Sequence, residues 1–484
     1  MPVKDNVYYD IEKNISSSLH AIKYLKDDKA YKVDLENFPI HNCMASSGIT
    51  ENDEFIVKIF IDKYSGNPFE RKMDKFGTKK NIIFIHNGRK YFMKENSYKT
   101  ISTTVSDPTI ITFEAGNFQD REDEYFENKR LRLIIPTNVE PEFDLFQSKR
   151  LHIAGTTYFS GLLEVKINNK NYHIFKHKND DSKESFLIVD SLEENTFDEF
   201  KKYTSAIILS YGFITGKLFQ DEYYYQVLRC QDDYIHIDST AYFKKEASII
   251  NGAEIFSPIE FEQYLDYFKK KHLFDLEKLR LSPIIFSNIC EKVLNNVPLS
   301  RSIKLILEAT QTKLLLLKAG ILSIALETIT GFVSDENEKK MKPIADKKLS
   351  KKIIEKFKEV VNEYESFISD YGKNILTSKI DNINSPTNSK KLSKPFEIYN
   401  LKLSKTELEI LNHRNKFLHG TSPFEEEDLQ NKDSDIAFIS KKLLTLCNSL
   451  ILKYCGYSGH TIDYSGYHQL RWENKVTEHL FKII

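Results

Sequence analysis

Arg414, Asn415 and His419 are the residues whose types and close spacing could do chemistry. They stand in the segment SKTELEILNHRNKFLHG, where the histidine follows the arginine by five positions. A histidine can move a proton to or from a 2′-hydroxyl or a leaving 5′-oxygen, and an arginine can stabilise negative charge on phosphorus. The three side chains together can therefore serve phosphodiester chemistry without a metal ion.

A helix of about 15 residues is predicted to carry these side chains, ending at His419 or just past it. Ser404 with Glu407 fits a capping box at its start, and Gly420 followed by Pro423 fits a C-terminal stop. A histidine at the C-terminal end of a helix lies at the negative end of the helix dipole, which favours the imidazolium form.

Arg414 is predicted to lie between two apolar stripes of this helix. The first stripe is Leu408, Leu411 and Leu418, the second is Ile410 with Phe417, and the solvent side holds Lys405, Glu409, Asn412 and Lys416. An unpaired buried guanidinium is costly. Arg414 is therefore expected either to pair with a carboxylate inside the protein or to line a cleft that receives an anion.

The segment Leu314–Val333 is long and apolar enough to be a membrane candidate, but Lys318 and Glu327 lie inside it. We expect a central helix buried by protein, and no membrane partner. Glu327 then needs a partner, either Arg414 or Lys318, or it supports an active site. The sequence leaves these alternatives open.

Composition places the chain among soluble globular proteins of two or three domains, with 484 residues, 40% hydrophobic and 29% charged. Lys plus Arg number 69 and Asp plus Glu 70, which excludes a uniformly basic coat for nucleic acid. The five cysteines form no CxxC, which favours a reducing compartment over a disulfide scaffold. The N-terminal residues contain no apolar stretch of the kind found in secretory signals, so a cytoplasmic location is expected.

Strand patterns dominate from about residue 50 to 275, while residues 1–50 are ambiguous. Short runs rich in β-branched and aromatic residues recur, including EFIVKIFID, RLRLIIP, SFLIVD and YYYQVLRC, with turn residues between them. Aromatic side chains in these runs are expected to be core residues first. Residues 1–276 are therefore predicted to form a β-rich, sandwich-like module, with the option of two subdomains.

Helical periodicity replaces the strand pattern after residue 276. It is sustained over Ser300–Val333 and Leu349–Tyr371, and further helices are predicted from Ser404 and over Asp435–Tyr454. Lys373–Lys394, rich in Asn, Ser and Lys, is predicted to be a loop or partly disordered insertion. Residues 277–456 are thus expected to form a compact helical bundle, and 457–484 a tail that covers it or contributes to self-association.

Charge differs between the two parts: residues 277–484 have a net charge of +6 and the remainder −7. The excess positive charge is concentrated in residues 339–405, which contain 16 lysines and eight acidic residues. This stretch is either a polyanion-binding surface or a solvated lysine-rich face.

The hexapeptide Arg414-Asn415-Lys416-Phe417-Leu418-His419 matches the R-x4–6-H signature of HEPN ribonucleases. Together with Gly420 and the preceding long helices, it resembles the HEPN domains of Apea-like abortive-infection proteins over residues 277–456. The resemblance implies a bundle that dimerises to build a composite, metal-independent active site without a cofactor. It implies RNA cleavage to a 2′,3′-cyclic phosphate and a 5′-hydroxyl, with Arg414 and His419 as the catalytic pair and Asn415 as orienting partner.

Other patterns are assigned no catalytic role. Arg229 and His236 also satisfy the signature, but they stand in strand-turn-strand sequence. His173 and His177 would share one face of a strand, yet no third metal ligand can be named, so a surface pair is expected.

We therefore expect an α+β multidomain protein, with a β-rich module followed by a HEPN bundle. The expected function is an endoribonuclease effector of anti-phage defence, acting on RNA, with tRNA among the candidate substrates. A phage-derived trigger acting on the N-terminal module and a homodimer or higher assembly are also expected. The alternative is a non-catalytic HEPN module for dimerisation and for RNA or nucleotide binding. A carbohydrate- or peptide-binding β scaffold is a third option.

Overall fold

The computed structural model describes most of the chain. The described residues are 11–34, 43–50, 54–61, 81–94, 98–104, 108–153, 156–179, 183–231, 234–244, 256–259, 279–418, 432–470 and 479–484. The chain divides into two compact units, the first comprising Met1–Ile208, Leu218–Ile250 and Arg280–Cys290, the second Leu209–Lys217, Asn251–Leu279 and Glu291–Ile484. The boundary predicted at residue 276 lies outside the described residues.

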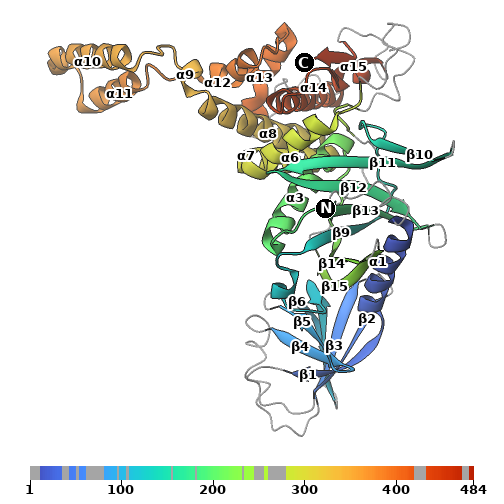
Figure 1. Ribbon diagram of the computed structural model, residues 1–484. Coiled ribbons are helices and arrows are strands. Elements are labelled where there is room, and N and C mark those ends of the chain that lie inside the picture. The colour runs from blue at the N-terminus through green and yellow to red at the C-terminus, as the bar shows by residue number, and fades with distance from the viewer. Residues whose placement is uncertain are drawn as a thin grey trace. The chain divides into compact units, whose positions relative to one another are not determined.

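The first unit is built on an antiparallel sheet of fifteen described strands (Figure 1). Their bounds are β1 Lys29–Asp34, β2 Met44–Ile49, β3 Phe55–Ile61, β4 Ile82–His86, β5 Arg89–Met93, β6 Tyr98–Thr104, β7 Thr109–Ala115, β8 Asn117–Gln119, β9 Arg130–Thr137, β10 Lys149–Ile153, β11 Thr156–Ile167, β12 Lys170–Lys178, β13 Ser185–Ser191, β14 Glu222–Gln231 and β15 Tyr234–Lys244. The strand order is β10-β11-β12-β13-β9-β14-β15-β8-β5-β4-β1-β2-β3-β7-β6. The described pairing between β5 and β8 is a single residue pair, Phe92 opposite Gln119, which is the shortest pairing between neighbouring strands of the sheet.

Turn chemistry and alternation explain why these segments pair. Asn87 and Gly88 take φ values of 49° and 75° between β4 and β5, the left-handed pair that a two-residue hairpin requires. Along β3, side chains alternate between buried and less buried positions, as expected of a strand with one face on the core. The buried aromatic residues Tyr31, Phe84 and Phe118 pack edge-on or tilted against one another, which confirms that sheet aromatics form core.

Arg229 and His236 face each other across the β14–β15 hairpin. The strand context predicted for this second match to the Arg–His signature is therefore confirmed.

Among the described residues, two α-helices accompany the sheet, and the strand pattern revealed neither. From α1 (Ile11–Lys26), Ser18 accepts a hydrogen bond at 2.8 Å from the fully buried Arg132, whose guanidinium also forms a two-bond ion pair with Asp190 at 2.7 Å. The second helix, α3 (Phe197–Thr215), begins with a capping box. There the backbone N–H of Glu199 donates to Thr196 Oγ1 at 3.2 Å and that of Thr196 to the Glu199 carboxylate at 3.4 Å.

Helices make up most of the second unit. Their bounds, with those of two short strands, are α7 Val297–Gln311, α8 Leu315–Glu336, α9 Glu338–Met341, α10 Lys347–Glu363, α11 Asp370–Asp381, α12 Asn388–Ile398, α13 Lys405–Leu418, α14 Lys432–Tyr454, α15 Tyr464–His468, β16 His460–Ile462 and β17 Phe481–Ile483; α6 (Pro283–Asn295) begins in the first unit. The predicted succession of a β-rich N-terminal part and a helical C-terminal part is confirmed.

Helix α8 is central to this unit, because α7, α12, α13 and α14 all pack against it. Among the described helices it alone is long and apolar enough to cross a membrane, and half of its apolar stretch is buried inside the protein. Buried side chains such as Leu322, Leu326 and Ile329 line its inner face.

The prediction of a loop over Lys373–Lys394 is wrong, because α11 and α12 occupy most of it. The small polar residues that suggested a loop act instead as helix caps. Ser369 and Thr387 each accept a hydrogen bond from a backbone N–H in the first turn of α11 and α12, respectively. Asn384 bonds both to the backbone N–H and to the C=O of Ile344.

Candidate active site

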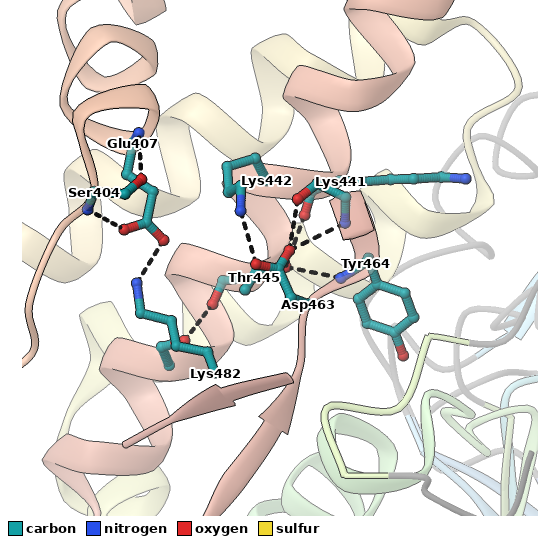
Figure 2. Close-up of polar contacts among 10 residues, drawn as sticks. Ser404, Glu407, Lys441, Lys442, Thr445, Asp463, Tyr464 and Lys482 are labelled. Atoms are coloured by element: carbon teal, nitrogen blue, oxygen red, sulfur yellow. Dashed lines mark hydrogen bonds and ion pairs between the residues drawn. The ribbon is translucent and has the colours of Figure 1, made fainter. Parts of the chain in front are cut away.

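The helix that carries Arg414 starts as predicted, with a capping box. The backbone N–H of Ser404 donates to the Glu407 carboxylate at 2.8 Å, and that of Glu407 donates to Ser404 Oγ at 3.1 Å (Figure 2). Two backbone donors at the N-terminus of α13 are thereby satisfied, which fixes where this helix begins.

A second contact on Glu407 ties the start of α13 to the C-terminal tail. Lys482 Nζ, from β17, donates to Glu407 Oε1 at 2.5 Å, and the exposed fractions of the two side chains are only 13% and 5% (Figure 2). Because β17 pairs with β16, the tail holds α13 through a nearly buried ion pair. The described residues of the tail therefore contact the bundle, as one of its two predicted roles requires.

The buried face of α13 differs from the predicted stripes. Glu407, Ile410, Leu411 and Arg414 are buried, at the i, i+3, i+4 and i+7 spacing of one helical face, whereas Leu408 is 42% exposed. The core-facing side of the helix therefore contains two charged residues. The predicted stripe with Leu408 is wrong, because it considered only the leucine positions. The buried face instead includes the charged side chains of Glu407 and Arg414.

Arg414 pairs with Glu327 of α8. Arg414 Nη1 donates to Glu327 Oε2 at 3.0 Å, and the Arg414 side chain is 7% exposed while that of Glu327 is 56% exposed. The Nε atom of Arg414 has no hydrogen-bond acceptor among the described residues. The guanidinium is thus buried on the protein side, and its carboxylate partner reaches solvent. Of the two partners predicted for Glu327, Arg414 is the one found.

The other two predicted site residues are only partly placed. Asn415 follows Arg414 in the last described turn of α13, but its side chain lies outside what the structure describes. His419 follows directly on Leu418, the last residue of α13, and also lies outside the described residues, as do Gly420 and Pro423. Of the three predicted site residues, the structure therefore places only the Arg414 side chain.

No family model, curated protein or solved structure matches this chain.

A buried polar cluster on the neighbouring helix α14 was not found from the sequence. Lys442 Nζ donates to Asp463 Oδ2 at 2.7 Å, with side-chain exposures of 1% and 6% (Figure 2). Asp463 also caps α15 by accepting from the backbone N–H and hydroxyl of Ser465. These contacts fix the first part of the tail on α14, and the Asp-x-Ser sequence before a short helix is the signal that could have revealed the cap.

A cavity of about 190 Å³ lies in the second unit, lined by Phe256 and by side chains of α7, α8, α14 and α15. Its lining is mainly apolar, with Lys318, Lys441 and His468 as its basic members. Lys441 Nζ and His468 Nδ1 are 3.4 Å apart. Such a cavity has the chemistry to receive a small ligand with an apolar body and an acidic group.

Metal ligands and reactive thiols are not concentrated near this site. Among the described residues, no group of three or more His, Cys, Asp or Glu side chains could hold a metal ion. Burial raises the pKa of the Cys455 thiol to about 12 and that of Cys447 well above its usual range, so both thiols stay protonated and are poor nucleophiles.

Proposed function

We propose that the chain is a metal-independent endoribonuclease whose catalytic pair is Arg414 and His419. The observation that supports this best is the setting of Arg414. Its guanidinium is held in a nearly buried position by Glu327, yet Glu327 is half-exposed and Arg414 Nε has no acceptor among the described residues. Buried polar groups are usually hydrogen-bonded, so the Nε of Arg414 is a donor that a bound phosphate could use.

The chemical roles follow from the side chains. Arg414 binds the scissile phosphate and stabilises the charge that develops on phosphorus as the 2′-hydroxyl attacks. His419 transfers a proton, either from that hydroxyl or to the leaving 5′-oxygen, and Asn415 orients the reacting groups. The products are a 2′,3′-cyclic phosphate and a 5′-hydroxyl, as the resemblance to HEPN ribonucleases implies.

The biological role rests on the same resemblance. We propose an abortive-infection effector that acts in the cytoplasm on RNA, as a homodimer with a composite active site. The β-rich unit is then the regulatory part that responds to a phage-derived trigger. The four cysteines whose side chains the structure describes are all free thiols, as a reducing compartment would leave them.

The proposal is tested by incubating purified full-length protein with total RNA in EDTA. Cleavage is expected to persist in EDTA and to be lost in His419→Ala, which should keep the wild-type oligomeric state and melting temperature. Loss of cleavage on chelation, or full cleavage by His419→Ala, would reject the proposal.

A second candidate function is a non-catalytic module that binds a nucleotide or RNA. The cavity beside α8 and α14, with Lys318 and Lys441 in its lining, favours it. Under this alternative, His419→Ala retains full protection of cells against phage. Lys441→Ala would instead abolish protection and the stabilisation of the protein by added nucleotide.

A further inference from the structure

Helices α10 and α11 form an arm, defined here as residues 344–384. The arm is closed at its base by the two hydrogen bonds between Asn384 and the backbone of Ile344, at 2.8 and 3.0 Å. Lys358 of α10 and Asp381 of α11 form an ion pair at 2.5 Å, and Figure 1 shows the two helices side by side. In the part of the chain that the structure describes, α11 is the principal packing partner of α10.

The arm leaves large apolar side chains in solvent. Ser350 is the sole buried residue of α10, and α11 has none. Nine large apolar residues between 349 and 383 are 38–85% exposed, namely Leu349, Phe357, Val360, Tyr364, Phe367, Tyr371, Ile375, Leu376 and Ile383. Exposed apolar side chains gathered in this way mark an interaction surface.

Four apolar residues of α10 and the C-cap residue Tyr364 form one continuous seam. Leu349, Ile353, Phe357, Val360 and Tyr364 follow one another at intervals of four, four, three and four residues, which is close to the spacing of a coiled-coil seam. The seam is distinct from the side of α10 that carries Lys358 and packs on α11. It is therefore a face suited to another helix.

Charge along α10 is polarised in an unusual direction. After the N-cap Asp346, the first two turns of α10 carry Lys347, Lys348, Lys351 and Lys352 and no acidic residue. Residues 359–370 carry Glu359, Glu363, Glu365 and Asp370 and no lysine, and Glu365 is paired with Lys373 of α11 at 2.6 Å. A helix dipole favours the opposite placement, with acids at the N-terminus and lysines at the C-terminus. An antiparallel neighbour of the same sequence would correct this, because it brings an acidic end beside each basic end.

We propose that the arm is a self-association surface, on which a second copy of this chain packs its α10 antiparallel about a twofold axis between Phe357 and Val360. In this register Phe357 of one copy faces Val360 of the other, and the Lys347–Lys352 end lies beside the Glu365–Asp370 end. The four exposed apolar residues of the seam, each about half exposed, form the centre of this contact, and their area lies below the ~800 Å² that each partner buries in a standard interface. RNA and anionic membranes fit less well, because the acidic half of the seam would repel them. This proposal is independent of the proposed nuclease function.

The experiment places a single cysteine on the seam of the full-length chain. Phe357→Cys should give a covalent dimer of twice 56.6 kDa with a short bismaleimide, because the two copies of this position lie on either side of the axis. Glu355→Cys is the matched control: it lies two residues away on the opposite face of α10, is 57% exposed and should stay monomeric on denaturing gels. The wild-type chain, treated in the same way, controls for the native thiols.

Charge reversal supplies a second readout in the Phe357→Cys background. Lys351→Glu with Lys352→Glu should lower the crosslinked fraction at low salt, and further addition of Glu363→Lys should restore part of it, while Glu365 is left unchanged because it is paired with Lys373 within the arm. Equal crosslinking of Phe357→Cys and Glu355→Cys, or none at either position, would overturn the proposal. So would flotation of the wild-type chain with anionic vesicles in the absence of any crosslink, which would make the seam a membrane surface.

Discussion

At the level of single residues, Glu407 and Arg414 give the clearest contrast in the second unit. Both lie on the buried face of α13 and both have a partner of opposite charge. Glu407 is sealed, since its partner Lys482 is only 13% exposed, whereas the partner of Arg414 is half in solvent. Glu407 is thus enclosed together with its partner, whereas the partner of Arg414 is in contact with solvent.

Arg414→Lys keeps the charge and the contact with Glu327 but removes the planar fork of donors. If Arg414 binds the phosphate, RNA cleavage should fall by about 10²–10³-fold while the melting temperature stays near that of the wild type. Single-turnover cleavage and thermal unfolding, measured on the same preparation, check this. A lysine variant that melts normally and cleaves at the wild-type rate would assign Arg414 a structural role.

Protonation of His460 should make the stability of the folded protein depend on pH. Burial lowers its pKa from the ordinary 6.5, so the unfolded chain binds a proton that the folded chain releases. The contribution of His460 to stability is complete above about pH 6.5 and is lost as the pH falls below that value. Melting temperatures measured at about pH 7.5 and 5.5 should fall less steeply for His460→Gln, and an unchanged slope would contradict the assignment.

Residue contacts were predictable where the partners are local or few. The capping box of Ser404 and Glu407 could be predicted because its two members are three positions apart. The ion-pair partner of Glu327 could be limited to Arg414 or Lys318, because Lys318 is the only other charged residue in that apolar segment. Lys482 could not be assigned to Glu407, because the two are 75 positions apart and only the fold brings them together.

At the level of elements, strands and helices with a clear hydrophobic period could be predicted, and helices marked only by their caps were missed. The strands predicted from alternating apolar runs are present, and α14 (Lys432–Tyr454) closely matches the predicted Asp435–Tyr454. Helix α3 was missed because its buried residues lie on several of its sides, so the sequence shows no amphipathic period. Its capping box, formed by Thr196 and Glu199, was the signal present in the sequence. Helices α11 and α12 were missed because polar caps resemble loop sequence.

The start of α13 should depend on its cap and on the tail. Ser404→Ala should lower the free energy of unfolding by about 1 kcal/mol through loss of the cap. Lys482→Ala should cost about 3 kcal/mol, because it leaves Glu407 buried without its cation. Urea unfolding measures both, with Lys405→Ala as control, since that side chain is 93% exposed and should change nothing. Equal effects of Lys482→Ala and Lys405→Ala on the free energy of unfolding would show that the Lys482–Glu407 ion pair does not stabilise the protein.

At the level of the whole molecule, the division into a β-rich part and a helical part could be predicted from the change of hydrophobic period. The strand order could not, because β9 pairs with both β13 and β14 and β15 pairs with β8, all through segments distant in sequence. The arm was likewise invisible, because exposure of an amphipathic helix depends on which elements cover it.

A composite active site predicts complementation between protomers. Arg414→Ala and His419→Ala are each expected to be inactive, yet after mixing and exchange of subunits they should recover about a quarter of the wild-type rate. Half of the dimers would then be mixed, and each mixed dimer has one complete site. Cleavage measured before and after exchange tests this, and no recovery in verified mixed dimers would mean that each chain holds its own pair.

The chemistry assigned to Arg414 and His419 is tested most directly by the ends of the RNA fragments. Full-length protein is incubated in EDTA with a short end-labelled RNA, and the product termini are identified by mass. The account predicts 2′,3′-cyclic phosphate and 5′-hydroxyl ends for the wild type and intact RNA for His419→Ala. Fragments with 5′-phosphate and 3′-hydroxyl ends, or cleavage that persists in His419→Ala, would contradict it.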